Sequence, residues 1–140
     1  MLSDSVQKTR EIAKEFLSAL KKSDKAVVVG LRGDLGSGKT AFVKMVAEHL
    51  GLKGTLSSPT FVIEKIYKLK NKNFNHLIHI DAYRLEDGEE LKMLGWDEIS
   101  ADSNNLIFIE WPENVENILP SQTKFIDFKF INETAREINY

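Results

Sequence analysis

The feature that most constrains the fold is a short apolar run followed at once by closely spaced glycines and a helix-forming segment. The run "AVVVGL" (26–31) is rich in β-branched residues, which is typical of a strand covered on both faces. Gly33, Gly36 and Gly38 follow it. Behind them, "KTAFVKMVAEHL" predicts a helix over 39–50 that stops at Gly51. A buried strand, a glycine turn and a helix in this order indicate an α/β domain.

The other segments extend this α/β pattern. Apolar residues at helical spacing predict an amphipathic helix over 4–22, and "GEELKMLGWDEI" (88–99) predicts a short helix followed by a turn. The β-rich runs 60–70 and 74–85 are separated by "NKN", which indicates a hairpin. Further strands are expected at 106–109, 125–131 and 136–140.

The glycine stretch also has the pattern of a phosphate-binding loop. "GDLGSGKT" matches G-x-x-x-x-G-K-[ST] between a strand and a helix. Glycine angles and the first helical turn direct several N–H groups toward one centre, where the helix dipole favours an anion. Lys39 can reach β- and γ-phosphate oxygens, and the Thr40 hydroxyl can bind a bridging magnesium ion. We therefore predict a polyphosphate site made by Gly33, Asp34, Leu35, Gly36, Ser37, Gly38, Lys39 and Thr40.

Two acidic residues stand where buried strands end. "LIFIE" ends at Glu110, and "HLIHID" ends at Asp81. Ligands of open parallel sheets collect at the carboxyl ends of strands, which favours a place for both acids beside a magnesium triphosphate. Glu110 is interpreted as a metal-side carboxylate, with a simple exit of the chain to solvent as the alternative. Asp81 would hold the metal through water or orient the attacking water.

One histidine and the two tryptophans are interpreted as structural or packing residues rather than as catalytic or ligand-binding ones. His79 is interpreted as a structural residue. Trp96 and Trp111 are interpreted as packing residues, but Trp111 follows Glu110 directly and can shape the site.

Composition limits the classes of function. The 140 residues are 42% hydrophobic and carry a net charge of -2, which fits one domain over 1–140 and argues against a free-standing nucleic-acid binder. The absence of cysteine excludes disulfides and thiol chemistry. Charges interrupt the N-terminal segment, and no apolar run approaches the roughly 20 residues of a membrane span. We expect a cytoplasmic protein without a membrane partner.

Four stretches together resemble one family, the bacterial TsaE (YjeE) ATPases of tRNA threonylcarbamoyladenosine synthesis. They are "GDLGSGKTAFVKMVAEHLG", "SSPTFVIEKIY", "HIDAYRLEDGEELKMLGWDEI" and "IEWPENVENILP", and they cover most of residues 30–120. Ser37 stands at a usual alanine position and Ala82 at a usually larger apolar one. Only Thr9 and Arg136 look like family positions near the chain ends.

The resemblance implies a single P-loop NTPase-like domain with a mainly parallel central sheet, an antiparallel hairpin extension and flanking helices. It implies ATP or ADP and Mg²⁺ as ligands, with Thr40 and Glu110 on the metal side. Ser58 to Thr60 would form a switch that responds to the third phosphate. Thr9 and Arg136 would flank the base or ribose. The partners implied are TsaB and TsaD, with tRNA bound only indirectly through them.

The sequence leaves three other functions as alternatives. A kinase usually brings several arginines to the phosphates, whereas this chain has four arginines in all and shows no lid insertion. A GTPase needs N-K-x-D, but the nearest segment, "NKNF", has Phe74 in place of the carboxylate. The third alternative is a nucleotide-gated binding module whose slow hydrolysis only resets a complex. Turnover measured with and without partners would distinguish it from the ATPase.

Overall fold

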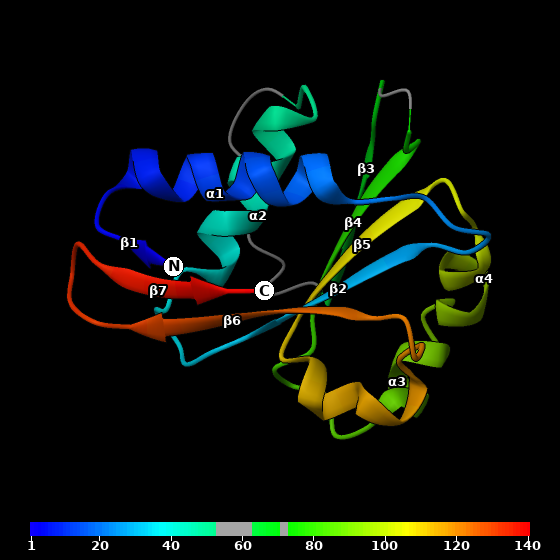
Figure 1. Ribbon diagram of the computed structural model, residues 1–140. Coiled ribbons are helices and arrows are strands. Elements are labelled where there is room, and N and C mark those ends of the chain that lie inside the picture. The colour runs from blue at the N-terminus through cyan, green and yellow to red at the C-terminus, as the bar shows by residue number, and fades with distance from the viewer. Residues whose placement is uncertain (53–62, 71–72) are drawn as a thin grey trace.

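The computed structural model describes residues 1–52, 63–70 and 73–140, which form one seven-stranded sheet with helices on both faces (Figure 1). The strand order is β1-β7-β6-β2-β5-β4-β3. The four central strands run parallel: β6 (Lys124–Phe130), β2 (Val27–Arg32), β5 (Asn105–Glu110) and β4 (His76–Asp81). Antiparallel strands flank them: β3 (Glu64–Lys68), β7 (Arg136–Asn139) and β1 (Leu2–Ser3). The predicted parallel centre and antiparallel hairpin extension are thereby confirmed.

The two strands that carry the predicted site lie at the middle of the sheet. β2 pairs with β6 on one side and with β5 on the other. Every residue of β5 is buried, as are the first five residues of β2. Helices cover both faces here, which explains why "VVVGL" and "LIFI" are continuous apolar runs rather than alternating ones.

Two longer helices cover one face of the sheet. They are α1 (Val6–Ala19) and α2 (Lys39–His49), which Figure 1 shows crossing above the strands. The Ser5 side chain caps α1 by accepting a hydrogen bond from the Lys8 N–H. Phe16 of α1 and Phe42 of α2 meet edge to face, with ring centroids 6.1 Å apart. Both rings belong to the larger apolar core, which fixes α2 and therefore the loop that precedes it.

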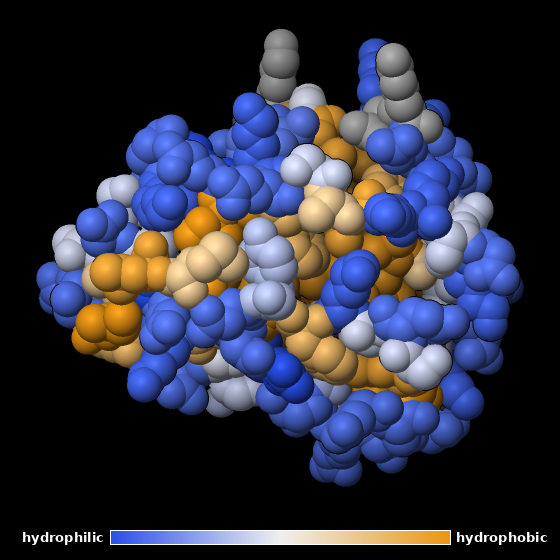
Figure 2. All heavy atoms as spheres, in the orientation of Figure 1, coloured by the Kyte–Doolittle hydropathy of each residue, from blue (hydrophilic) through white to orange (hydrophobic). Residues whose placement is uncertain are grey.

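Shorter helices cover the other face. These are α3 (Gly88–Lys92), α4 (Trp96–Ala101) and the 3-10 helix η1 (Pro112–Ile118). They enclose a second apolar core built on Ile78, Ile80, Ile107 and Ile109. Figure 2 shows mainly hydrophilic residues over one side of the molecule, with apolar residues visible between α1 and the strands.

Most predicted elements are confirmed, with differences at their ends. The first helix spans Val6–Ala19 rather than 4–22, because Ser5 caps it and the chain turns extended at Leu20. The segment 88–99 forms two helices, since Gly95, with φ of 89°, ends one turn and begins α4. Strand β1 was not predicted, because its two residues are too few to show an alternating pattern. Residues 60–62 and 71–72 of the predicted hairpin lie outside the described residues.

Within the described ranges, no helix is long and apolar enough to cross a bilayer.

Candidate functional site

Strand register brings distant parts of the chain to one edge of the sheet. Leu31, near the end of β2, lies opposite Glu110 of β5, and Asp81 of β4 lies opposite Glu110 on the other side. The glycine loop begins two residues after Leu31. The loop and both predicted acids therefore meet at the carboxyl edge of the parallel strands, as expected for an open α/β sheet.

The loop after β2 has the backbone of an anion cradle. Gly36 and Gly38 have φ of 78° and 104°, in the left-handed region that favours glycine. The Ser37 N–H donates to the Asp34 carbonyl at 3.1 Å, which closes a turn. Gly38 caps α2, and the Phe42 N–H already donates to its carbonyl. The N–H groups of the first helical turn lack partners within the helix and point toward the loop, so they are available to an anion.

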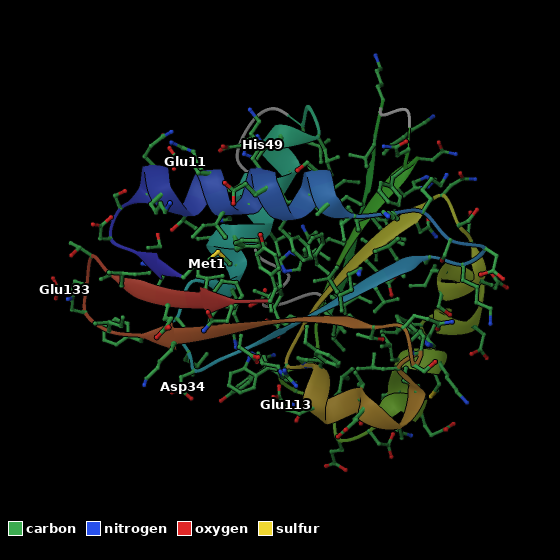
Figure 3. The ribbon with its side chains drawn as sticks, in the orientation of Figure 1. Met1, Glu11, Asp34, His49, Glu113 and Glu133 are labelled. Atoms are coloured by element: carbon green, nitrogen blue, oxygen red, sulfur yellow. The ribbon has the colours of Figure 1, made fainter. Side chains whose placement is uncertain are left out.

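Lys39 is held inside this loop. Its ammonium donates to the Gly33 carbonyl at 2.5 Å and lies 3.6 Å from the centroid of the Trp111 ring. The residue is 4% exposed. Burial lowers the pKa of Lys39, and the surrounding carboxylates of Glu110, Glu113, Asp81 and Asp34 oppose that shift. Figure 3 labels Asp34 and Glu113, which lie on the segments that follow β2 and β5.

Thr40 and Glu110 contact each other directly. The Thr40 hydroxyl lies 2.9 Å from both carboxylate oxygens of Glu110, to which it donates. The His79 Nε2 atom lies 2.6 Å from Glu110 Oε2. Glu110 is 4% exposed, so it does not simply leave the core for solvent at the end of β5. A buried carboxylate with these two partners is instead part of a built polar cluster.

Asp81 is more open than Glu110. Its Oδ1 atom accepts a hydrogen bond from the Tyr83 N–H at 3.0 Å. The Tyr83 ring in turn packs on Trp111, with centroids 5.2 Å apart. Trp111 has φ of 60°, which turns the chain sharply from β5 into η1 and leaves the indole beside the loop. These contacts place Asp81 and Trp111 on the same cleft.

The cleft at this edge has a volume of about 380 Å³. Its walls come from the glycine loop, the start of α2 and the ends of β4 and β5. The residues that line it are Leu35, Gly36, Gly38, Lys39, Thr40, Ala41, Ile63, Asp81, Tyr83, Arg84, Glu110 and Trp111. Eight of these were predicted from the sequence as site residues, and they come from three separate stretches.

Other predicted site residues lie beside the cleft or outside the described ranges. Arg136 covers the loop from β7: a Cβ atom built on Gly38 would lie 2.2 Å from its Nη1 atom. Thr9 does not line the cleft, because its buried hydroxyl contacts Ser3 Oγ at 2.6 Å. Gly33, Asp34 and Ser37 form the back of the loop. Ser58 and Thr60, the predicted switch, lie outside the described residues.

The chemistry of the donor set fits magnesium on a triphosphate better than a metal held by protein alone. Among the described residues, no group of three or more His, Cys, Asp or Glu could hold a metal ion. Magnesium usually keeps several waters and takes one or two protein oxygens together with phosphate oxygens. Thr40, Glu110 and Asp81 supply such oxygens beside the loop.

Five residues of the cleft and its polar surroundings were not predicted as site residues. His79 was interpreted as structural, and it contacts Glu110. The other four line the cleft: Ala41, Ile63, Tyr83 and Arg84. The available signal was periodicity: His79 precedes Asp81 by two residues, so both side chains share one face of β4. Which acid His79 would meet depended on strand order, which the sequence did not reveal.

A central strand that leads through a glycine loop into a helix with Lys39 and Thr40, beside strands that end in acids, defines a protein of P-loop NTPase-like fold. The family model described as threonylcarbamoyl adenosine biosynthesis protein TsaE matches residues 3–138. The chain therefore belongs to the TsaE family.

Individual relatives agree with this assignment. A protein named tRNA threonylcarbamoyladenosine biosynthesis protein TsaE from Rickettsia typhi is 37% identical over 95% of this chain and 88% of its own length. The protein of the same name from Bacillus subtilis is 38% identical over 96% of this chain and 79% of its own. A crystal structure of Bacillus subtilis YdiB superposes with a TM-score of 0.76 at 30% identity, covering 99% of this chain and 80% of that one.

Proposed function

We propose that this protein is the ATP-binding and ATP-hydrolysing component of the machinery that makes threonylcarbamoyladenosine in tRNA. In this proposal it acts with TsaB and TsaD, of which TsaD carries out the transfer, and it meets tRNA only through them. Membership of the TsaE family supports the role in this modification. The cleft at the glycine loop supports the nucleotide chemistry.

The contact between Thr40 and Glu110 is the observation that carries the proposal. It joins the first turn of α2 to the end of β5 through 2.9 Å hydrogen bonds, at the mouth of a loop whose N–H groups suit phosphate. The hydroxyl donates its hydrogen to Glu110, so its lone pairs are left for a cation. A glycine turn that served only to connect β2 with α2 would have no need of this buried pair.

Each part of the cleft has a task in ATP hydrolysis. The loop N–H groups and Lys39 bind and orient the phosphates, and Thr40 with Glu110 holds the metal side. Magnesium, when bound, neutralises charge on the triphosphate. Asp81 orients water or binds the metal through water. The phosphates replace Trp111 as the partner of the Lys39 ammonium, and Trp111 and Tyr83 shield one side of the cleft from solvent.

The test is reconstitution of tRNA modification with purified TsaB, TsaD, tRNA and the substrates of the transfer. Wild-type protein should consume ATP and sustain repeated cycles of threonylcarbamoyladenosine formation. Lys39→Ala should fold but fail to sustain them, whereas Lys44→Ala, five residues further along α2, should behave as wild type. Modification that proceeds equally well with Lys39→Ala would refute the proposal, as would ATP-dependent phosphorylation of a small molecule by the protein alone.

A further inference from the structure

A buried histidine is built into the polar cluster behind the cleft. His79 lies on β4, two residues before Asp81, and its side chain is 4% exposed. Its Nε2 atom is 2.6 Å from Oε2 of Glu110, whose side chain is 5% exposed. Because a carboxylate oxygen can only accept, the Nε2–H group of His79 donates this hydrogen bond. His79 does not line the cleft itself.

The contact continues through Glu110 to Thr40. The Thr40 hydroxyl is equidistant from the two carboxylate oxygens, at 2.9 Å from each. A hydroxyl has one hydrogen, so donation to Glu110 fixes the direction of its lone pairs. Those lone pairs point away from the carboxylate. The rotation of the Glu110 carboxylate therefore sets the direction in which Thr40 offers its oxygen.

Two anchors hold that carboxylate, and they come from different elements. Thr40 lies on α2, and His79 lies on β4, which pairs with β5 through the register His79 to Phe108 and Asp81 to Glu110. The neighbouring acid cannot replace His79, because Asp81 offers only acceptor oxygens. Without His79, the Oε2 atom of Glu110 would lose a donor in a site that is closed to solvent, which favours rotation of the carboxylate.

We propose that His79 is a positioning residue for the metal side of the cleft. Through Glu110, it holds the Thr40 hydroxyl in the orientation that binds the cation of a metal–triphosphate complex. The inference rests on the proposed ATP-binding function and deepens it. It separates two properties of the site: phosphate binding by the loop and Lys39 is independent of His79, whereas the gain in affinity from magnesium depends on it.

The experiment measures ATP binding by calorimetry, with magnesium and with EDTA, and uses the ratio of the two affinities as its readout. His79→Leu, which lacks a donor, should lower that ratio roughly tenfold to hundredfold while leaving the EDTA affinity unchanged. His79→Gln should restore most of the ratio, because its amide nitrogen reaches the position of Nε2. His79→Asn, whose amide is shorter by one carbon, should remain impaired.

Two further variants serve as a negative and a positive control. His49→Gln alters an exposed histidine of α2 whose ring contacts the Arg10 carbonyl, and should leave both affinities unchanged. Thr40→Ala should reproduce the loss of the magnesium effect. A wild-type ratio in His79→Leu would overturn the inference and leave ATP binding intact. Equal loss of both affinities would also overturn it, since His79 would then only support packing. Failure of wild-type protein to bind ATP at all would instead reject the proposed function itself.

Discussion

The Lys39 ammonium lies 3.6 Å from the centroid of the Trp111 ring, although 72 positions separate the two residues in the chain. The same ammonium donates to the Gly33 carbonyl of its own loop. The charge that should meet a phosphate is therefore satisfied by a cation–π contact and a backbone oxygen. A triphosphate in the loop would compete with both contacts.

Trp111 should report nucleotide binding by a change in fluorescence. If Lys39 turns toward phosphate, the cation leaves the face of the indole and its emission changes. The chain has two tryptophans, and Trp96 is buried at 2% exposure in the opposite core. Emission of the Trp96→Phe variant should thus change saturably as ATP is added. An emission that stays constant while calorimetry shows full binding would contradict this movement.

Lys39→Ala should lower the affinity for ATP at least about tenfold, because a hydrogen bond to a charged group contributes roughly 1.5–3 kcal/mol. The loop N–H groups remain, so residual binding is expected. Calorimetry checks this, with Lys44→Ala as the matched variant on the same helix. Wild-type affinity in Lys39→Ala would place the triphosphate elsewhere.

The sequence predicts structure well where the conformation of a segment depends only on the residues within that segment. The strand, loop and helix around Gly33 to Thr40 follow from local chemistry, and so does the end of β5 before Pro112, whose ring prevents a further ladder hydrogen bond. The predicted fold class follows from these patterns together with the family resemblance.

The rest depended on contacts between distant segments. No pattern within β4 tells that His79 meets Glu110, since that contact needs β4 and β5 to be neighbours in register. The two-residue strand β1 exists only because β7 lies beside it. Arg136 reaches Gly38 because β6 and β7 extend the sheet past the loop. Strand order is a property of the whole chain, and single-segment periodicity does not contain it.

The two acids at the strand ends should be needed for turnover. Glu110→Gln removes the charge that Thr40 contacts, and Asp81→Asn removes an acceptor charge from the cleft. Each variant should lower ATP turnover on the order of tenfold to hundredfold, with a smaller effect on the urea midpoint of unfolding. A folded variant that hydrolyses ATP at the wild-type rate would make that acid structural.

Glu64 of β3 should destabilise the protein at neutral pH. Its Oε2 atom is shielded from solvent and lacks a hydrogen-bond partner in the described part of the chain. Burial raises the pKa of Glu64 above its ordinary value of 4.5. The folded state therefore holds the Glu64 proton more tightly, so the contribution of Glu64 to stability is greatest below pH 4.5 and is lost as pH rises through the raised pKa.

Glu64→Gln removes this charge. It should raise the melting temperature slightly at pH 7, because solvent screens a half-buried carboxylate, and the gain should shrink as pH falls toward 4.5. Glu133→Gln is the control, because Glu133 is exposed on the turn between β6 and β7 (Figure 3). A gain that is equal at both pH values would mean that charge burial is not its cause.

The proposed ATP hydrolysis should be slow for the isolated chain and faster with the proposed partners, TsaB and TsaD. The cleft is bounded by one small sheet edge, and Tyr83 and Leu35 at its rim are 52% and 71% exposed. Within the described residues this part of the rim is open to water, on the side that Trp111 and Tyr83 do not cover, and water weakens the electrostatic stabilisation of a transition state. A protein docked over this rim would exclude water, which favours hydrolysis.

Phosphate release should accordingly increase when TsaB and TsaD are both added, and Lys39→Ala should show no such increase. Free tRNA should bind the isolated chain weakly and in a strongly salt-dependent manner, because a net charge of -2 allows only nonspecific phosphate contacts. Steady-state assays of phosphate release, with each partner omitted in turn, measure the first effect. Fast hydrolysis by the isolated chain, with no response to either partner, would show that the cleft is complete by itself and would contradict a role that depends on docking.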